Sequence, residues 1–230
     1  KNINKKRKYK INKKLFYKNP LDIFKFKKID ILFESIGLSG GISKKVVEKA
    51  IRNKVHVITP NKALIAKHGD YLSILAEKYK VNLEFEASVA GGIPILRTIK
   101  EGIATNKIFK VYGILNGTCN YILSQMEKSN NQFKDVLKQA QKLGYAEPGN
   151  PKLDLNGYDA LAKVKILSSL SFNKKISKNK CLMEGIENIE SKDFDIAEQL
   201  NLRIKLLGIT EIVDNKLFER VHPCLVKKNT

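Results

Sequence analysis

Several features that would place this chain in other protein classes are missing from its 230 residues. No run of 18 or more apolar residues is present, so a transmembrane helix is not expected. The lysine-rich start also lacks the apolar segment and the small-residue cleavage site of a secretory signal. The sequence therefore predicts a soluble, cytoplasmic protein that is long enough to bury one large core or two small ones.

Cysteine is scarce as well. The three cysteines, Cys119, Cys181 and Cys224, are far apart in the sequence and odd in number. Neither a disulfide framework nor a zinc site has the spacing that it needs. We expect all three thiols to stay reduced.

Acidic residues are almost absent from one segment. Residues 1–28 contain 12 Lys or Arg and a single acid, Asp22, and so carry +11 of the formal net charge of +20. Such a segment is typical of a solvated, poorly ordered start. It also leaves a basic nucleic-acid-binding module as an alternative function, although no helix-turn-helix, RNA-recognition or zinc-finger pattern accompanies the charge.

What the sequence does contain is an alternation of apolar runs and amphipathic segments. Residues 29–37 and 56–60 are short apolar runs that end in turn residues, and residues 43–53 between them carry apolar side chains at helical spacing. Strand, helix and strand together predict a unit of a doubly wound parallel sheet, and therefore an α/β protein.

Lys62 lies where sheets of this kind bind ligands. Thr59 and Pro60 precede a helix, so Lys62 falls in its first turn, beside the carboxyl end of a parallel strand. The helix dipole disfavours a cation at this position. Position alone leaves both a functional role and an ordinary surface role open for Lys62.

Further elements follow along the chain. Residues 81–89 alternate strictly between apolar and polar side chains and predict a half-exposed strand. A helix begins near Pro94, and residues 107–115 predict another strand. Helices are expected after Asn116, which can serve as the cap, and over residues 133–144.

The stretch LDLNGYDALAKVKIL places charges in an otherwise apolar helix, which Asp154 or Asn156 can cap. Asp159 and Lys163 are four residues apart and therefore share one face of this helix. Spacing alone favours an exposed ion pair over a functional pair. Lys165 is rotated away from that face and is expected to be an ordinary solvated lysine.

Several segments, taken together, resemble a known family. The segment AQKLGYAEPGNPKLDLNGYDALAK, residues 140–163, resembles the signature of homoserine dehydrogenase, the NAD(P)-dependent enzyme of threonine and methionine synthesis. Five other segments resemble blocks of that family in the same order, over residues 29–227. They are HVITPNKALIAKHG, FEASVAGGIPILRTIKEG, VYGILNGTCNYIL, RIKLLGI and RVHPCLV.

The resemblance implies an activity and roles for named residues. The activity is the reduction of L-aspartate 4-semialdehyde to L-homoserine, with NADP or NAD as the cofactor. By the same resemblance Lys163 is the proton donor and Lys62 lies near the nicotinamide and the substrate, so both are candidate catalytic residues. Glu147, Asp159 and Asp154 are the candidate substrate-binding carboxylates, which suit an ammonium group and a hydroxyl.

The resemblance also implies contacts with a cofactor and a cation. The candidate cofactor contacts are Ile36, Gly37, Lys62 and Gly144. A sodium ion is implied as well, held by one carboxylate and by main-chain carbonyls, which are the hard ligands that such a cation prefers. The candidate sodium ligands are Glu86, Val89, Gly91 and Ile93.

The implied organisation is a partial Rossmann-type dinucleotide-binding domain over residues 1–60, followed by an α+β substrate-binding and dimerisation domain over residues 61–230. The GxGxxG loop that grips the dinucleotide has no counterpart in the sequence, and the family continues beyond HPCLVKKNT. We therefore expect an internal fragment without a complete cofactor site. Its expected partners are a small-molecule substrate and further copies of the chain, in a homodimer or homotetramer, and no membrane. A non-catalytic oligomerisation remnant is a further alternative.

Overall fold

The computed structural model describes Tyr9, Asn12 and residues 15–25, 28–129, 131–149 and 151–228. The chain divides into two compact units, Lys1–Phe85 and Glu86–Thr230, each with a sheet of its own. The expectation of poor order over residues 1–28 falls partly outside the described residues. Within that segment, Pro20–Lys25 forms a short 3-10 helix, η2.

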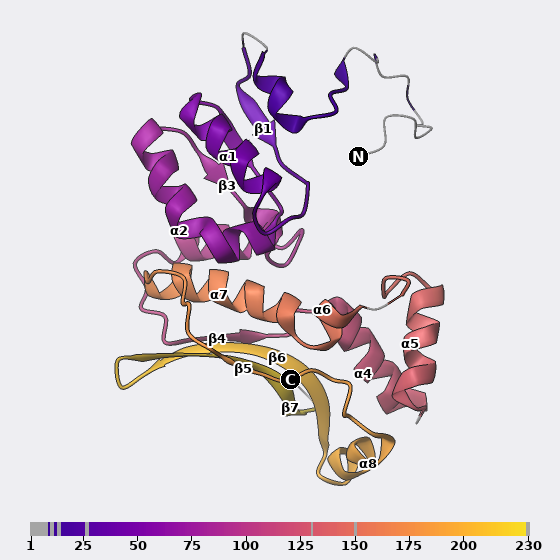
Figure 1. Ribbon diagram of the computed structural model, residues 1–230. Helices are drawn as coiled ribbons and strands as arrows, with labels where there is room; N and C mark the ends of the chain where they lie inside the picture. The colour runs from indigo at the N-terminus through magenta and orange to yellow at the C-terminus, as the bar shows by residue number, and fades with distance from the viewer. Residues whose placement is uncertain are drawn as a thin grey trace. The chain divides into compact units, whose positions relative to one another are not determined.

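The first unit is a small parallel α/β layer (Figure 1). Its sheet has the order β1-β2-β3, with both strand pairs parallel. The bounds of its elements are β1 Ile31–Phe33, α1 Ile42–Arg52, β2 His56–Ile58, α2 Lys62–Tyr79 and β3 Leu83–Glu84. The parallel strand, helix and strand expected from residues 29–60 are thus confirmed, with Leu32 opposite Val57.

The boundary between the units lies later than residue 60. Helix α2 and strand β3 both belong to the first unit, because Leu83 pairs with Val57 in the central strand of its sheet. α2 also packs on α1 through buried leucines such as Leu64 and Leu72. The segment that contains Lys62 is therefore an integral part of the parallel layer.

The prediction of a strand over residues 81–89 is wrong beyond Glu84. Burial alternates as far as Phe85, but Ser88 and Val89 are both buried, and Glu86–Ser88 forms a 3-10 turn, η3. The Glu86 carboxylate accepts hydrogen bonds from the backbone N–H groups of residues 96 and 97, 2.9 Å away in each case. These bonds tie the turn at Glu86 to residues 96 and 97 of the second unit.

The second unit is an α+β layer whose sheet has the order β4-β6-β7-β5. Its strands are β4 Lys110–Gly113, β5 Leu182–Met183, β6 Leu202–Val213 and β7 Lys216–Lys227. Its helices are α3 Ile95–Arg97, the π-helical turn η4 Thr98–Gly102, α4 Gly117–Ser129, α5 Phe133–Lys142, α6 Lys152–Leu155, α7 Tyr158–Phe172 and α8 Ser191–Gln199. The mixed α/β class expected from the sequence is confirmed.

Helices α4 and α7 cover one face of this sheet (Figure 1). Gly208 of β6 permits the close approach, since a Cβ atom added there would lie 2.6 Å from a methyl group of Val164 and 2.7 Å from one of Leu115. The opposite face exposes large apolar side chains on three strands. They are Tyr112, Leu182 and Phe218, which are 67%, 62% and 44% exposed.

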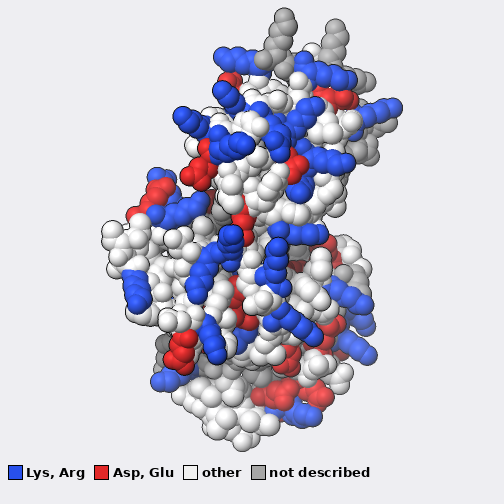
Figure 2. Space-filling view, turned by 60° about the vertical axis from the view of Figure 1, so that its left-hand side comes forward, with Lys and Arg blue, Asp and Glu red and all other residues white. Residues whose placement is uncertain are grey.

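The surface charge is mixed. On the face drawn in Figure 2, Lys and Arg side chains are spread widely, with Asp and Glu side chains among them. No helix of the described chain has the length and apolar character needed to cross a membrane.

Candidate active site

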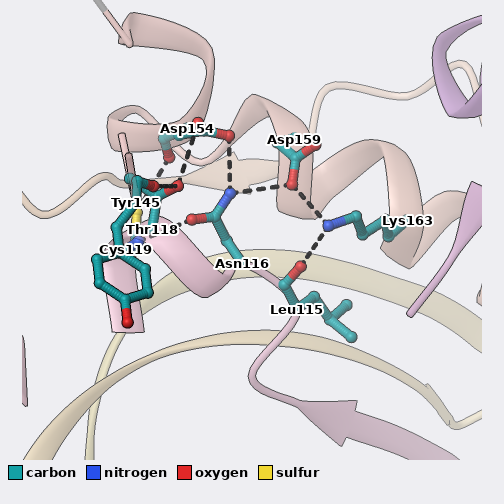
Figure 3. Close-up of polar contacts among 8 residues, drawn as sticks. All are labelled: Leu115, Asn116, Thr118, Cys119, Tyr145, Asp154, Asp159 and Lys163. Carbon is teal, nitrogen blue, oxygen red and sulfur yellow. Dashed lines mark hydrogen bonds and ion pairs between the residues drawn. The ribbon is translucent and has the colours of Figure 1, made fainter. Parts of the chain in front are cut away.

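The centre of the site is the turn that joins β4 to α4. Asn116 is the residue before α4, and its side-chain Oδ1 accepts a hydrogen bond from the backbone N–H of Cys119 at 2.8 Å. This bond caps the helix, as the sequence predicts. The turn lies under the start of α7, where it meets Asp159 and Lys163 (Figure 3).

Asp159 and Lys163 form an ion pair along the first turns of α7. Lys163 Nζ lies 2.7 Å from Asp159 Oδ2 and also donates to the carbonyl oxygen of Leu115 at 2.5 Å. Their side chains are only 16% and 8% exposed, for Lys163 and Asp159 respectively. The preference for an exposed pair is therefore wrong, because the β4–α4 turn covers this face of the helix. A pair that is desolvated to this degree is costly to break from one side.

Asp154 joins the pair through Asn116. The Nδ2 group of Asn116 donates to Asp154 Oδ1 at 2.8 Å and to Asp159 Oδ2 at 3.0 Å. Asp154 also lies beside Thr118, whose hydroxyl donates to the carbonyl of Tyr145 at 2.9 Å and is 3.5 Å from Asp154 Oδ2. Two carboxylates and one ammonium are thus held in one hydrogen-bonded cluster (Figure 3).

Neither Asp154 nor Asn156 caps α7, contrary to expectation. The residue before this helix is Gly157, which has a φ of +85° and makes no side-chain cap. Asp154 lies in the preceding short helix α6 and directs its carboxylate to Asn116. The left-handed glycine allows α6 and α7 to meet at a sharp angle, so that Asp154 and Asp159 reach the same amide.

The loop after α5 carries Gly144 and Glu147. Gly144, with a φ of +79°, follows the end of α5 as predicted. Glu147 is exposed, and its backbone carbonyl accepts a hydrogen bond from the Gln141 side chain at 3.2 Å. Tyr145 stacks on Tyr121 of α4 with ring centroids 4.2 Å apart. The stacked tyrosines hold this loop against α4.

Three of the four candidate cofactor contacts, Ile36, Gly37 and Lys62, lie in the first unit, which also holds a buried carboxylate, whereas Gly144 lies in the second unit. Glu34, which is 2% exposed, accepts hydrogen bonds from the Thr59 hydroxyl at 2.6 Å and from the backbone N–H of Ile36 at 2.8 Å. Asn61 caps α2 by accepting from the backbone of residue 64. Lys62 is therefore the first residue of α2, at the carboxyl edge of the parallel strands, as expected.

Comparison with known proteins supports one family. The homoserine dehydrogenase family model matches residues 94–230, and the model of the NAD binding domain of homoserine dehydrogenase matches residues 1–86. The chain belongs to the homoserine dehydrogenase family. The homoserine dehydrogenase of Neisseria gonorrhoeae is 44% identical over 93% of this chain, and that of Bacillus subtilis is 37% identical over 98%.

Solved structures of the family share the fold. A homoserine dehydrogenase from Thiobacillus denitrificans has a TM-score of 0.88 at 42% identity and covers 93% of this chain, which in turn covers 49% of that one. A homoserine dehydrogenase from S. aureus has a TM-score of 0.82 at 39% identity and covers 99% of this chain, which covers 56% of that one. A hyperthermophilic archaeal homoserine dehydrogenase in complex with NADPH has a TM-score of 0.78 at 23% identity and covers 94% of this chain, which covers 61% of that one.

The chain spans about half the length of its curated homoserine dehydrogenase relatives, since it covers 49% of the Neisseria protein and 52% of the Bacillus protein. Both of its units have counterparts in the family, one in the NAD binding domain and one in the homoserine dehydrogenase model. This division agrees with the two compact units.

The structure brings together only some of the residues that the homoserine dehydrogenase resemblance singles out. Asp154, Asp159 and Lys163 share one cluster, whereas Glu147 lies on the exposed loop after α5. Sequence reasoning treated Asn116 as a helix cap only and assigned no role to the Leu115 carbonyl. A capping asparagine uses its side-chain oxygen and leaves two N–H donors free to bind other groups. These two donors are the feature of the sequence from which further contacts of Asn116 could be expected.

The thiol of Cys119 lies against the same cluster. It donates to the Asp154 carbonyl oxygen at 3.2 Å, and its burial, aided by the negative charges of Asp154 and Asp159, raises its pKa to about 12. At pH 8 this lowers its thiolate fraction about a thousandfold relative to an ordinary thiol.

We therefore expect iodoacetamide at pH 8 to label Cys181 and Cys224 in the folded protein and to leave Cys119 unmodified. Cys181 and Cys224 are only partly buried, although burial raises their pKa values as well. Mass spectrometry of peptides before and after denaturation measures the order of labelling. Native labelling of Cys119 at the rate of Cys224 would contradict the buried position of the Cys119 thiol.

Proposed function

We propose that this chain forms the reacting half of a homoserine dehydrogenase, which reduces L-aspartate 4-semialdehyde to L-homoserine in threonine and methionine biosynthesis, in the cytoplasm. The observation that carries the proposal is the cluster of Asp154, Asp159 and Lys163 in a chain of this family, in which Asp159 is buried and the other two are partly buried. A nicotinamide cofactor supplies the hydride that reaches the aldehyde carbon. The protein has to bind the amino acid and to give a proton to the aldehyde oxygen.

Lys163 is suited to give that proton. An ammonium has three N–H groups, and within the described part of the chain Lys163 donates two of them, to Asp159 and to the Leu115 carbonyl. The third can point to the aldehyde oxygen, where it stabilises the negative charge that develops as hydride arrives. Transfer of this proton completes the alcohol and leaves a neutral amine, which solvent can reprotonate.

The charge of the cluster suits an amino acid as substrate. Of the three charged groups described in the cluster, two are carboxylates, and a carboxylate favours a ligand with an ammonium group. We assign this group to Asp154 and Asp159, with Glu147 closing over the ligand from its exposed loop.

The first unit is suited to approach a nicotinamide cofactor. A Cβ atom added at Gly37 would meet no atom within 4 Å, so its backbone borders open space at the carboxyl edge of the sheet. Ile36 and Lys62 lie at the same edge, and Gly144 in the second unit also borders open space. The family model for an NAD binding domain and the NADPH complex of a structural neighbour support this assignment, with either NADP or NAD.

The proposal includes a sodium ion bound beside Glu86. Glu86 offers a carboxylate, and each of its oxygens accepts one backbone N–H and retains a further lone pair. Within the described residues no group of three His, Cys, Asp or Glu side chains could hold a metal ion, so the cation needs main-chain carbonyls. Those of Val89, Gly91 and Ile93 are of the right type, and Gly91 has a left-handed φ of +56°, which glycine adopts without strain.

A second copy of the chain is the proposed partner. The sheet face away from α7 exposes Tyr112, Leu182 and Phe218 on three different strands. Burial of such a face between copies is the usual way to remove exposed apolar surface, and gives a homodimer or, through a further contact, a homotetramer.

The proposal is tested by an assay of the protein that carries this chain. We expect consumption of NADPH or NADH with L-aspartate 4-semialdehyde, and formation of one homoserine for each cofactor oxidised. Loss of absorbance at the nicotinamide band and chromatography of the product measure the two amounts. Cofactor consumption without homoserine, or none with either cofactor, would contradict the proposal.

A further inference from the structure

We propose that Asn116 is a positioning residue, which fixes the distance and orientation of the Asp154 and Asp159 carboxylates beside Lys163. The catalytic consequence rests on the function proposed above, whereas the structural role does not. The inference goes beyond helix capping, because the same side chain makes two further bonds to the acids (Figure 3).

The orientation of the Asn116 amide is set by its surroundings. Its oxygen accepts the Cys119 backbone N–H, and only the nitrogen of an amide can donate to carboxylates. A flipped amide would place its oxygen against two acids and its nitrogen against an N–H group. Asn116 is 4% exposed, so water offers little compensation for such a change. One planar group thus holds α4, α6 and α7 in register.

Asn116 also allows two like charges to share a small space. Asp154 and Asp159 both bind the same nitrogen, at 2.8 and 3.0 Å, so their carboxylates are close and repel each other. Each N–H group stabilises the ionised form of one acid without adding a charge. A cation in the place of the amide would offset one of these negative charges, whereas the neutral amide leaves both carboxylate charges for an ammonium ligand.

The same turn positions the proton donor. Leu115, which precedes Asn116, accepts from Lys163 through its carbonyl oxygen, while Asn116 binds the acid that pairs with Lys163. The two acids and the lysine are therefore all held by hydrogen bonds to two consecutive residues of one turn, Leu115 and Asn116. A change at Asn116 disturbs the acids directly and Lys163 through Asp159.

Two substitutions separate this role from capping. Asn116→Asp keeps an oxygen for the Cys119 N–H but removes the two donors, whereas Asn116→Ala removes both functions. We expect each variant to lose at least about tenfold in kcat and to move the acid limb of the rate–pH profile upward, by roughly one unit for Asn116→Asp. The shift follows because the carboxylates lose donors that favour their ionised forms.

Two controls match these changes. Glu190→Ala removes the capping box of α8, and Asn201→Asp makes the same exchange on an exposed turn of the same unit. Both should leave the acid limb in place. An unchanged acid limb in both Asn116 variants, or an equal shift in Glu190→Ala, would overturn the proposal.

A measurement on the unmutated protein needs neither turnover nor a stable variant. The two side-chain amide protons of Asn116 should exchange with solvent at least about a hundredfold more slowly than those of Asn201, because both are donated within a buried cluster. NMR exchange rates measure this. Exchange at equal rates would overturn the positioning role, and slow exchange in a protein without dehydrogenase activity would refute the proposed function alone.

Discussion

Replacement of Lys163 by methionine is expected to lower the rate of semialdehyde reduction by about a hundredfold to ten-thousandfold, the range that general acids contribute. Methionine keeps much of the length of the side chain but has no proton to give. The change in kcat should exceed the change in KM, because in the proposed mechanism the third N–H of Lys163 acts mainly on charge that develops during the reaction. Steady-state rates of NADPH oxidation measure both constants.

Lys165→Met is the matched control. Lys165 is on the same helix, two residues later, and is also partly buried, with its ammonium bound to the Ser177 carbonyl at 2.8 Å. The prediction that Lys165 is an ordinary solvated lysine is therefore wrong. Lys165 nevertheless lies outside the cluster of Asp154, Asp159 and Lys163. Its replacement should cost stability and little activity. Equal loss of kcat in both variants would assign the effect on Lys163 to helix packing.

The free energy of unfolding tests the Asp159–Lys163 ion pair independently of activity. Lys163→Met removes the ammonium that lies 2.7 Å from the Asp159 carboxylate, which is only 8% exposed, and should lower the free energy of unfolding by about 3 kcal/mol. The double variant Asp159→Leu with Lys163→Met removes both charges and should recover most of that loss while remaining inactive. An active double variant would rule out proton donation by Lys163.

The sequence predicted local features of this site more completely than its long-range contacts. Spacing placed Asp159 and Lys163 on one face of a helix, and that is confirmed. Whether this face is covered depends on Leu115 and Asn116, which lie more than 40 residues earlier and belong to a different element. Periodicity describes which residues share a face but carries no information on what lies against it.

The prediction of the fold from the sequence also failed where a long-range contact decides the structure. The parallel pairing of β1 with β2 was expected from two short apolar runs joined by an amphipathic helix, and it is confirmed. The alternation over residues 81–89 failed to mark the end of β3, because the Glu86 carboxylate bonds to the backbone ten and eleven residues later. A tertiary contact of one side chain overrode the local pattern.

Gly185→Ala is expected to be the most destabilising small substitution in the second unit, at about 3 kcal/mol or more. A Cβ atom at this position would lie 2.1 Å from the carbonyl oxygen of Leu155 and 2.8 Å from Cα of Asn156. Both are backbone atoms, so no side-chain rotation relieves the clash. The same carbonyl accepts the backbone N–H of Ile186 at 3.0 Å, which fixes the approach.

The clash falls on the junction between α6 and α7. Leu155 follows Asp154 directly, so the shift that accommodates the methyl group moves Asp154 away from Asn116. Semialdehyde reduction should therefore fall at temperatures where the variant is still folded, mainly through a higher KM. Gly102→Ala is the control, since its Cβ would lie at an ordinary 3.7 Å from a methyl group of Thr98. Urea unfolding followed by circular dichroism measures the stabilities, and a loss no larger in Gly185→Ala than in Gly102→Ala would show that this close contact does not hold the junction.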